Sequence, residues 1–126
     1  MEPIHLFSLA ARQRDWLSAR QSAVAQNIAN ANTPGFKALE VGKFEQELAG
    51  PRLASGVTNP MHMAVATQHD YAPEAVEADA TDPTHSGNSV SVEREFVKTG
   101  EIAQVFALNV GILKSFHRMM MMTAKG

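Results

Sequence analysis

The sequence predicts a mainly α-helical protein, in which long N- and C-terminal helices pair as an antiparallel coiled coil or helical bundle and flank an irregular central loop region. Two observations support this prediction. At both ends of the 126-residue chain, apolar residues recur at alternating spacings of three and four, which is the period of an α-helix. The middle of the chain instead holds five of the six prolines and five of the eight glycines, which interrupt regular structure.

The N-terminal helix is expected over residues 1–32. Pro3 suits a first helical turn, because a proline lacks the N–H group that has no partner there. Two apolar stripes follow the helical period, and their candidate assembly residues are Leu6, Phe7, Leu9, Trp16, Leu17, Val24 and Ile28. One partner helix covers one stripe, so a helix with two stripes is expected to pack against other chains as well.

The C-terminal helix is expected over residues 89–126, with Ser89 or Ser91 as its N-cap and with Glu93 and Glu95 in a first turn that favours negative charge. Its candidate assembly residues are Val92, Phe96, Ile102, Phe106, Val110, Leu113, Phe116 and Met120. Gly111 either lowers the helix propensity or marks a close approach between helices. This helix is longer than a domain of this size covers, which again favours assembly.

Residues 33–88 are expected to form an irregular, acidic, loop-rich connecting segment. Within it, 44–48 predicts a short helical turn and 61–66 could be one strand, whereas 72–87 is typical of a loop or of disorder. The stretch 38–88 carries a charge of −6, whereas each flanking end carries +2.

Composition excludes several classes of function. The chain has no cysteine, which excludes disulfides, thiolate metal sites and cysteine nucleophiles. A net charge of −2 argues against nucleic acid as a partner. No apolar run is long enough for an unbroken membrane span, and the N-terminus lacks the features of a cleavable signal peptide. Phosphate-binding, dinucleotide-binding and serine-hydrolase motifs are absent from the sequence, so we expect no enzyme, no cofactor and no small-molecule substrate.

The five histidines are the remaining candidates for catalysis or metal binding, and no two of them are spaced i, i+4. His62 and His69 with Asp70 could bind a metal across a loop, but this is the less favoured interpretation. His117 lies on an apolar stripe and is interpreted as an interface residue. The run 119–122 is four methionines, which we interpret as an adaptable packing surface rather than a membrane-seeking one.

One string of residues ends the first helix, and its members are Asn27, Ile28, Ala29, Asn30, Ala31, Asn32, Thr33, Pro34, Gly35, Phe36 and Lys37. Asn30 and Asn32 tolerate left-handed backbone and can satisfy the last helical carbonyls. Residues 33–36 fit a type II turn, in which Gly35 takes a positive φ. Asn27 lies on a face that otherwise packs, where a polar residue can fix the register between helices.

This string closely resembles the signature of bacterial flagellar axial proteins (rod, hook and hook-associated proteins). A second string, SGNSVSVERE at 86–95, resembles the entry to the C-terminal helix in the proximal rod family, FlgB. The resemblance covers the two ends of the chain and is weak across 38–85. Asn32 stands where Asp is frequent in the family, and Phe36 stands where Tyr is frequent.

The resemblance implies a structural subunit of the proximal rod in the flagellar basal body, which polymerises through its terminal helices into the periplasmic, torque-transmitting axis. Both helices would form one inner coiled-coil domain. It also implies type III export without a cleaved signal peptide, with Phe7 and Ala11 in a short export element. The implied partners are copies of the chain, other rod proteins, the junction protein between the MS ring and the rod, the MS ring itself and the export apparatus.

A second interpretation is a non-enzymatic helical adaptor or secretion chaperone that binds a partner through its central loop. A chaperone is expected to be stably folded alone, whereas a rod subunit is expected to have mobile ends before assembly. Limited proteolysis of the purified protein distinguishes the two.

Overall fold

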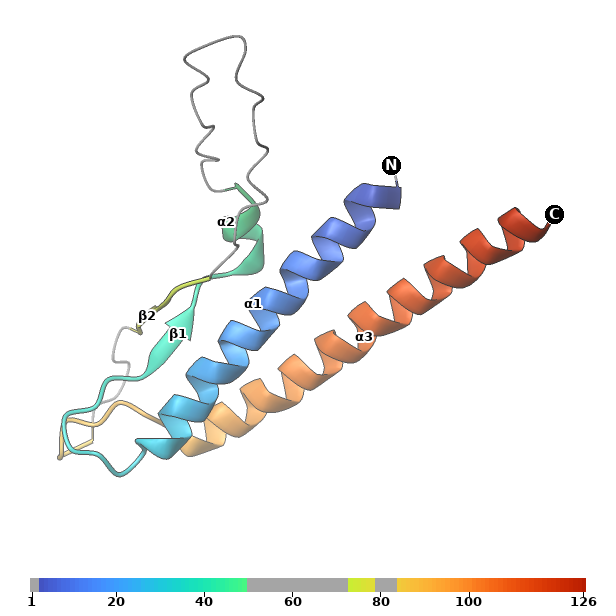
Figure 1. Cartoon of the computed structure of the whole chain (residues 1–126). Helices are drawn as coiled ribbons and strands as arrows, with labels where there is room; N and C mark the ends of the chain where they lie inside the picture. Colours follow the sequence, from blue (N-terminus) through green and yellow to red (C-terminus); the bar gives the residue numbers. More distant parts are fainter. Residues whose placement is uncertain (1–2, 50–72, 79–83) are drawn as a thin grey trace, which may run out of the picture.

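In the computed structural model, two long helices form a hairpin with a small two-stranded sheet beside it. Residues 3–49, 73–78 and 84–126 are described. The elements are α1 (Pro3–Ala29), β1 (Leu39–Val41), α2 (Phe44–Ala49), β2 (Ala75–Glu77) and α3 (Val92–Lys125). Helices α1 and α3 run antiparallel, so the two ends of the chain lie at the same end of the molecule (Figure 1). The predicted mainly helical fold with paired terminal helices is confirmed.

The hydrophobic core lies between α1 and α3. Its buried members are Leu17 and Val24 from α1 and Ile102 from α3, and Trp16, Ile28 and Val105 pack against them. These apolar residues leave water together, which is the main favourable term for pairing the two helices. Toward the N-terminus of α1 the helices diverge (Figure 1), and the rings of Phe7 and Phe116 meet edge to face there at 5.6 Å.

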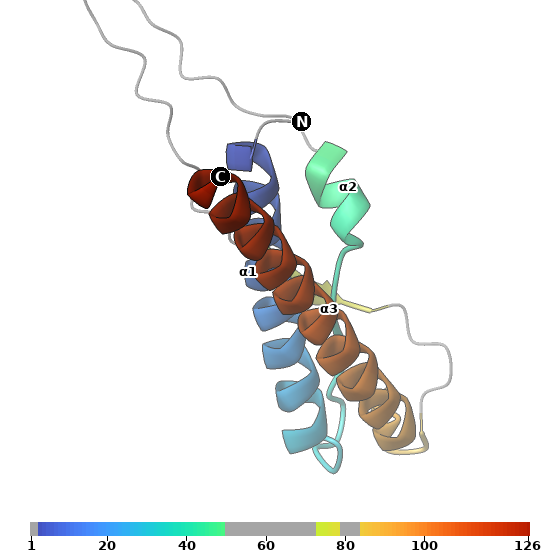
Figure 2. The ribbon, with the colours of Figure 1, turned by 90° about the vertical axis from the view of Figure 1, so that its right-hand side faces the viewer.

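The small sheet and α2 pack against a second side of α1 (Figures 1 and 2), and Lys98 of α3 also reaches Glu40 of β1 at 3.8 Å. Strands β1 and β2 are antiparallel, with Leu39 opposite Glu77. The indole N–H of Trp16 donates to the carbonyl oxygen of Gly42 at 2.7 Å, and the Trp16 ring lies 5.8 Å from that of Phe44. Part of the second apolar stripe of α1, which we expected other chains to cover, is therefore covered by the chain itself.

The connecting segment has more regular structure than its composition indicates. Helix α2 confirms the turn expected at 44–48, but β2 lies inside the stretch 72–87, where we expected a loop or disorder. That expectation was wrong because a three-residue strand held by backbone pairing is too short to show an alternating pattern. The strand considered at 61–66 lies outside the described residues.

The start of α3 agrees with the later of the two N-caps that we expected, Ser91, and not with Ser89. The helix begins at Val92 and not at residue 89, and Ser91 is the N-cap residue with φ −105° and ψ 111°. Its hydroxyl donates to the Glu93 carboxylate at 3.1 Å instead of accepting from a helical N–H. Glu93 and Glu95 do lie in the first turn, as expected.

Candidate functional site

The turn that follows α1 has the predicted geometry. Gly35 has φ +73°, and the N–H of Phe36 donates to the carbonyl oxygen of Thr33 at 3.3 Å. The side-chain amide of Asn30 donates to the carbonyl oxygen of Gln26 at 2.8 Å, so it satisfies one of the last helical carbonyls as expected. Neither Asn30 nor Asn32 uses the left-handed backbone that asparagine tolerates, because among the described residues only glycines have positive φ. The turn needs one left-handed residue, and Gly35 supplies it.

The second motif string packs directly onto this turn. The side-chain amide of Asn88 donates to the carbonyl oxygens of Asn30 at 2.9 Å and Thr33 at 2.8 Å, and the Gly35 N–H donates to Ser86 at 3.0 Å. Gly87 has φ +78°, and a Cβ atom there would lie 3.5 Å from the Cα of Gly35.

Sequence reasoning placed both strings at helix ends but did not predict that they meet. Asn88 was not among the candidate residues, although it is almost fully buried. The one available signal was the Gly-Asn pair a few residues before a helix, which is typical of a turn held by a side chain. We call the contact of residues 30–36 with 86–89 the junction.

A buried polar cluster lies beside the junction. Asn27 is 0% exposed, and its amide donates to Glu95 at 3.1 Å and to the carbonyl oxygen of Leu39 at 2.9 Å, while its own oxygen accepts from the Leu39 N–H at 2.7 Å. Glu95 is 2% exposed and forms a salt bridge with Lys98 at 3.0 Å. The cluster ties α1 to both α3 and β1, so only one register of the three elements satisfies it. Asn27 was predicted to fix helix register, whereas the burial of Glu95 was not foreseen.

A second buried asparagine joins the helices nearer their other end. The amide of Asn109 donates to Gln13 at 2.7 Å and to the carbonyl oxygen of Ala10 at 3.2 Å. Together with Glu95 and Ile102, Asn109 is spaced by seven residues along α3 and faces α1. The contacting face of α3 is therefore the row through Ile102, Val105 and Phe116.

The other candidate assembly residues of α3 form a second apolar row that is mostly left open. Phe96 is 63% exposed, Phe106 is 48% exposed and Met120 is 43% exposed. Of the other candidates on this helix, Val92, Val110 and Leu113 are half-buried. Further large apolar side chains on α3 are exposed: Val97, Leu108, Ile112, Met119, Met121 and Met122. Most of the apolar surface of α3 thus has no partner among the described residues.

The candidates near the N-terminus of α1 are less buried than those in its middle. Leu6 and Ala11 are half-buried, whereas Phe7 and Leu9 are exposed. Phe7 contacts Phe116 across the helix pair, so helix packing accounts for the ring in the folded subunit. Gly111 has no atom within 4 Å of the place where a Cβ would stand, so within the described chain it marks no close approach.

No metal site is visible among the described residues. His5, His85 and His117 are exposed, and no group of three or more His, Asp or Glu side chains in ranges 3–49, 73–78 and 84–126 is arranged to hold an ion. His62, His69 and Asp70, which were considered as ligands, lie outside the described residues. The described part of the chain instead offers a rigid junction and an open apolar helix.

Comparison with known proteins identifies the family to which the chain belongs. Residues 17–37, which include the second half of α1 and the junction turn, match the family described as "Flagella basal body rod protein". The chain is 46% identical to the flagellar basal body rod protein FlgB of Agrobacterium fabrum, over 99% of this chain and 96% of that protein. It is 28% identical to FlgB of Salmonella typhimurium, over 85% of this chain and 83% of that protein. The chain therefore belongs to the FlgB family and is a structural subunit of the flagellar basal body rod, not an enzyme.

Proposed function

We propose that this subunit enters the rod through the apolar faces that its own fold leaves open. The observation that supports this most strongly is the exposure of Phe96 and Phe106 on the same flank of α3. Burying a side chain of this size is favourable by about 1.5–3 kcal/mol, and soluble monomers rarely leave a large contiguous apolar patch in water. Neighbouring subunits would supply the surface that covers this flank.

The partners proposed for these faces are copies of the chain, other flagellar rod proteins, the junction protein between the MS ring and the rod, and the MS ring. Family membership supports this choice, because a rod is built from contacts between subunits. In this proposal the terminal helices act together as one inner domain. Their shared core of Leu17, Val24 and Ile102 supports it, because neither helix buries these side chains alone.

Delivery to the periplasm is proposed to use type III export in an unfolded state, with Phe7 and Ala11 in the recognised element and no cleaved signal peptide. In the folded subunit Phe7 is exposed, and its ring contacts that of Phe116. The export apparatus would read the element before that contact forms. The adaptor or chaperone interpretation loses its support, because it was an alternative to membership of a rod family.

The experiment that tests assembly changes the open flank and leaves the core intact. In the variant Phe96→Ala/Phe106→Ala, we expect a folded monomer, because exposed substitutions of this kind change stability by less than about 0.5 kcal/mol. We expect the variant to be missing from purified basal bodies on immunoblots and the cells not to swim. Gln104→Ala, at an exposed position between them, is the matched control. Normal incorporation of the double variant would refute the proposal.

A further inference from the structure

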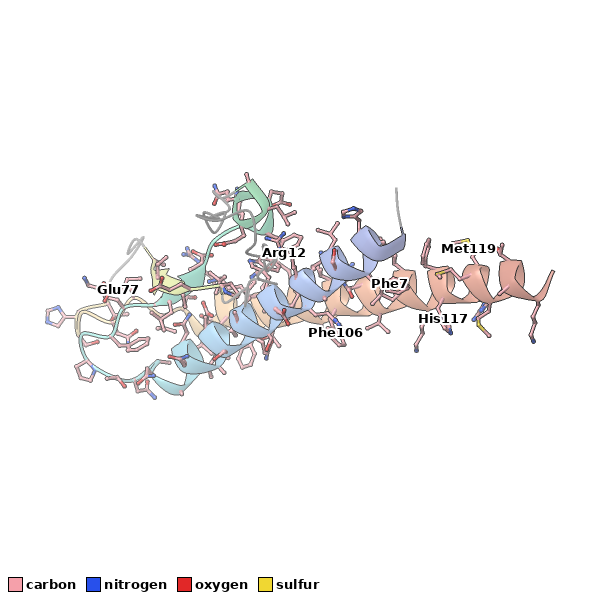
Figure 3. The ribbon with its side chains drawn as sticks, turned by 45° about the horizontal axis from the view of Figure 1, so that its top comes forward. Phe7, Arg12, Glu77, Phe106, His117 and Met119 are labelled. Carbon is pink, nitrogen blue, oxygen red and sulfur yellow. The ribbon has the colours of Figure 1, made fainter. Side chains whose placement is uncertain are left out.

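An apolar groove of about 570 Å³ lies at the end of the molecule where the chain termini meet. Phe7 of α1 forms one side, and Leu113, Lys114, His117, Arg118 and Met121 of α3 form the rest. Figure 3 shows Phe7 at the start of α1 and His117 and Met119 on the part of α3 that extends past it. The groove was not anticipated from the sequence, because it depends on how far the two helices overlap.

The groove continues the seam between the two helices. The contact of Phe7 with Phe116 is the last ring contact in this seam, and α3 then runs on to Lys125. This extension is about 14 Å long at 1.5 Å per residue. Met120 and Met121 are exposed along it. A helix placed here would pack on α3 as α1 does further down.

The charge of the groove is one-sided. Lys114, His117 and Arg118 line it, and no acidic side chain does. The described acidic residues of α3 all lie in its first ten residues, at the other end of the helix. None of the salt bridges among the described residues includes Lys114 or Arg118. Opposite charge on a ligand would therefore improve binding to this groove and select among apolar partners.

We propose that this groove binds an amphipathic helix of another protein, whose apolar side chains continue the α1–α3 seam and whose Asp or Glu residues face Lys114 and Arg118. The proposal rests on the proposed function in one respect, namely that other rod components are present. It goes further by stating the chemistry of the partner.

A second copy of this chain fits the groove less well. The described part of α1 carries one acidic residue, Asp15, and α2 is too short to fill the seam. On α3, Glu95 is buried and Glu101 is paired with Arg20 at 3.1 Å. Glu93 is the remaining carboxylate of α3 and lies at the far end of that helix. The long helices of the described chain thus offer few carboxylates to a basic groove, which favours a helix of a different chain as the occupant.

A lipid surface is the other class of partner, and the experiment must distinguish it from a helix. Helix α3 is long and apolar enough to cross a membrane by length and composition alone. However, the groove is a shallow surface between Phe7 on α1 and the basic side chains on α3, so its apolar and charged groups are arranged side by side rather than all around the helix. A helix with one acidic edge fits this shape better than a flat layer of headgroups.

The test uses two synthetic helical peptides with the same Leu and Ala face, one with Glu and one with Lys at the flanking positions. Binding to the purified full chain is measured by fluorescence anisotropy at low salt. We expect the Glu peptide to bind at least about tenfold more tightly than the Lys peptide. We expect this preference to shrink at 0.5 M NaCl, because salt screens exposed charges.

Two double variants with equal changes in net charge test whether the preference depends on the groove itself. Lys114→Glu/Arg118→Glu should reverse the preference between the peptides. Lys43→Glu/Arg94→Glu, at exposed positions away from the groove, should leave it unchanged. Equal binding of both peptides, or an equal effect of both double variants, would overturn the proposal.

Vesicles of phosphatidylglycerol and phosphatidylethanolamine in a 1:3 ratio provide the lipid arm. The proposal is wrong if the chain floats with these vesicles in a Lys114- and Arg118-dependent manner and binds neither peptide. Rod incorporation of the Phe96→Ala/Phe106→Ala variant is measured separately. Failure of the groove proposal therefore leaves the assembly proposal standing, and the reverse also holds.

Discussion

Substituting Asn27 by alanine should destabilise the subunit more than any other single change to a polar side chain of α1. The variant removes two hydrogen bonds to the backbone of Leu39 and one to the carboxylate of Glu95, all in a site closed to water. Neutral hydrogen bonds contribute about 1 kcal/mol each and a bond to a charged group about 2 kcal/mol. The expected loss is therefore about 4 kcal/mol. Leaving Glu95 with Lys98 as its remaining partner is part of this cost.

Urea unfolding of the full chain, followed by circular dichroism at 222 nm, measures this loss. With a slope of about 2 kcal/mol per molar urea, the midpoint should fall by about 2 M. Asn32→Ala is the matched control, because Asn32 is exposed in the adjoining turn and its loss should cost less than about 0.5 kcal/mol.

A double-mutant cycle with Glu95→Ala tests whether the two side chains act as one cluster. The double variant should cost about 1–2 kcal/mol less than the two single variants together, because neither single variant leaves both partners satisfied. The reasoning about the buried cluster is wrong if the urea midpoint of Asn27→Ala lies within about 0.5 M of that of the wild type. It is also wrong if the losses of stability in the two single variants add up to that of the double variant.

Three further predictions concern the core, the turn and the start of α3. Leu17→Ala should cost about 3 kcal/mol in urea unfolding, whereas Leu108→Ala, on the exposed flank, should cost less than about 0.5 kcal/mol. Gly35→Val should destabilise the subunit by about 1–2 kcal/mol and abolish swimming, because valine resists the positive φ of the turn; normal swimming would contradict this. The pKa of Glu93 is lowered by a hydrogen bond with its own backbone and by the Ser91 hydroxyl. Because the folded pKa is the lower one, the stabilisation exists above the usual glutamate pKa and is lost as pH falls through the folded pKa. In the variant Glu93→Gln, the helical signal in circular dichroism should therefore change less with pH over this acid range than it does in the wild type.

The paired helices could be predicted from the sequence because their signal is long and periodic. Leu17 and Val24 lie seven residues apart on α1, Ile102 continues an equally periodic apolar row on α3, and no local alternative competes with a helix over these lengths. The turn at Gly35 could be predicted for a similar reason, since the order of Pro34 and Gly35 selects one turn type.

What the sequence did not reveal depends on contacts between distant residues. The donation from Asn88 to Asn30 spans 58 positions, and nothing local to either residue encodes it. Strand β2 is held by its pairing with β1 and lies in a stretch whose composition favours a loop. The face of α3 that packs on α1 was also hidden, because α3 carries two apolar rows and the buried pair Asn27–Glu95 favours one of them.

The two ends of the subunit therefore have different roles. At the junction, two glycines and Asn88 close the turn, and the adjoining Asn27–Glu95 cluster satisfies buried polar groups within the chain. At the other end, α3 extends past α1 with apolar and basic side chains that have no described partner. The family match covers residues 17–37, which build the core and the junction turn and contribute nothing to the groove. The matched stretch therefore lies in the part of the chain that holds the fold together, whereas the surfaces that we propose for neighbours lie along α3. Gly35→Val and Lys114→Glu/Arg118→Glu should fail differently for this reason: the first in stability, the second in binding by a subunit that remains folded.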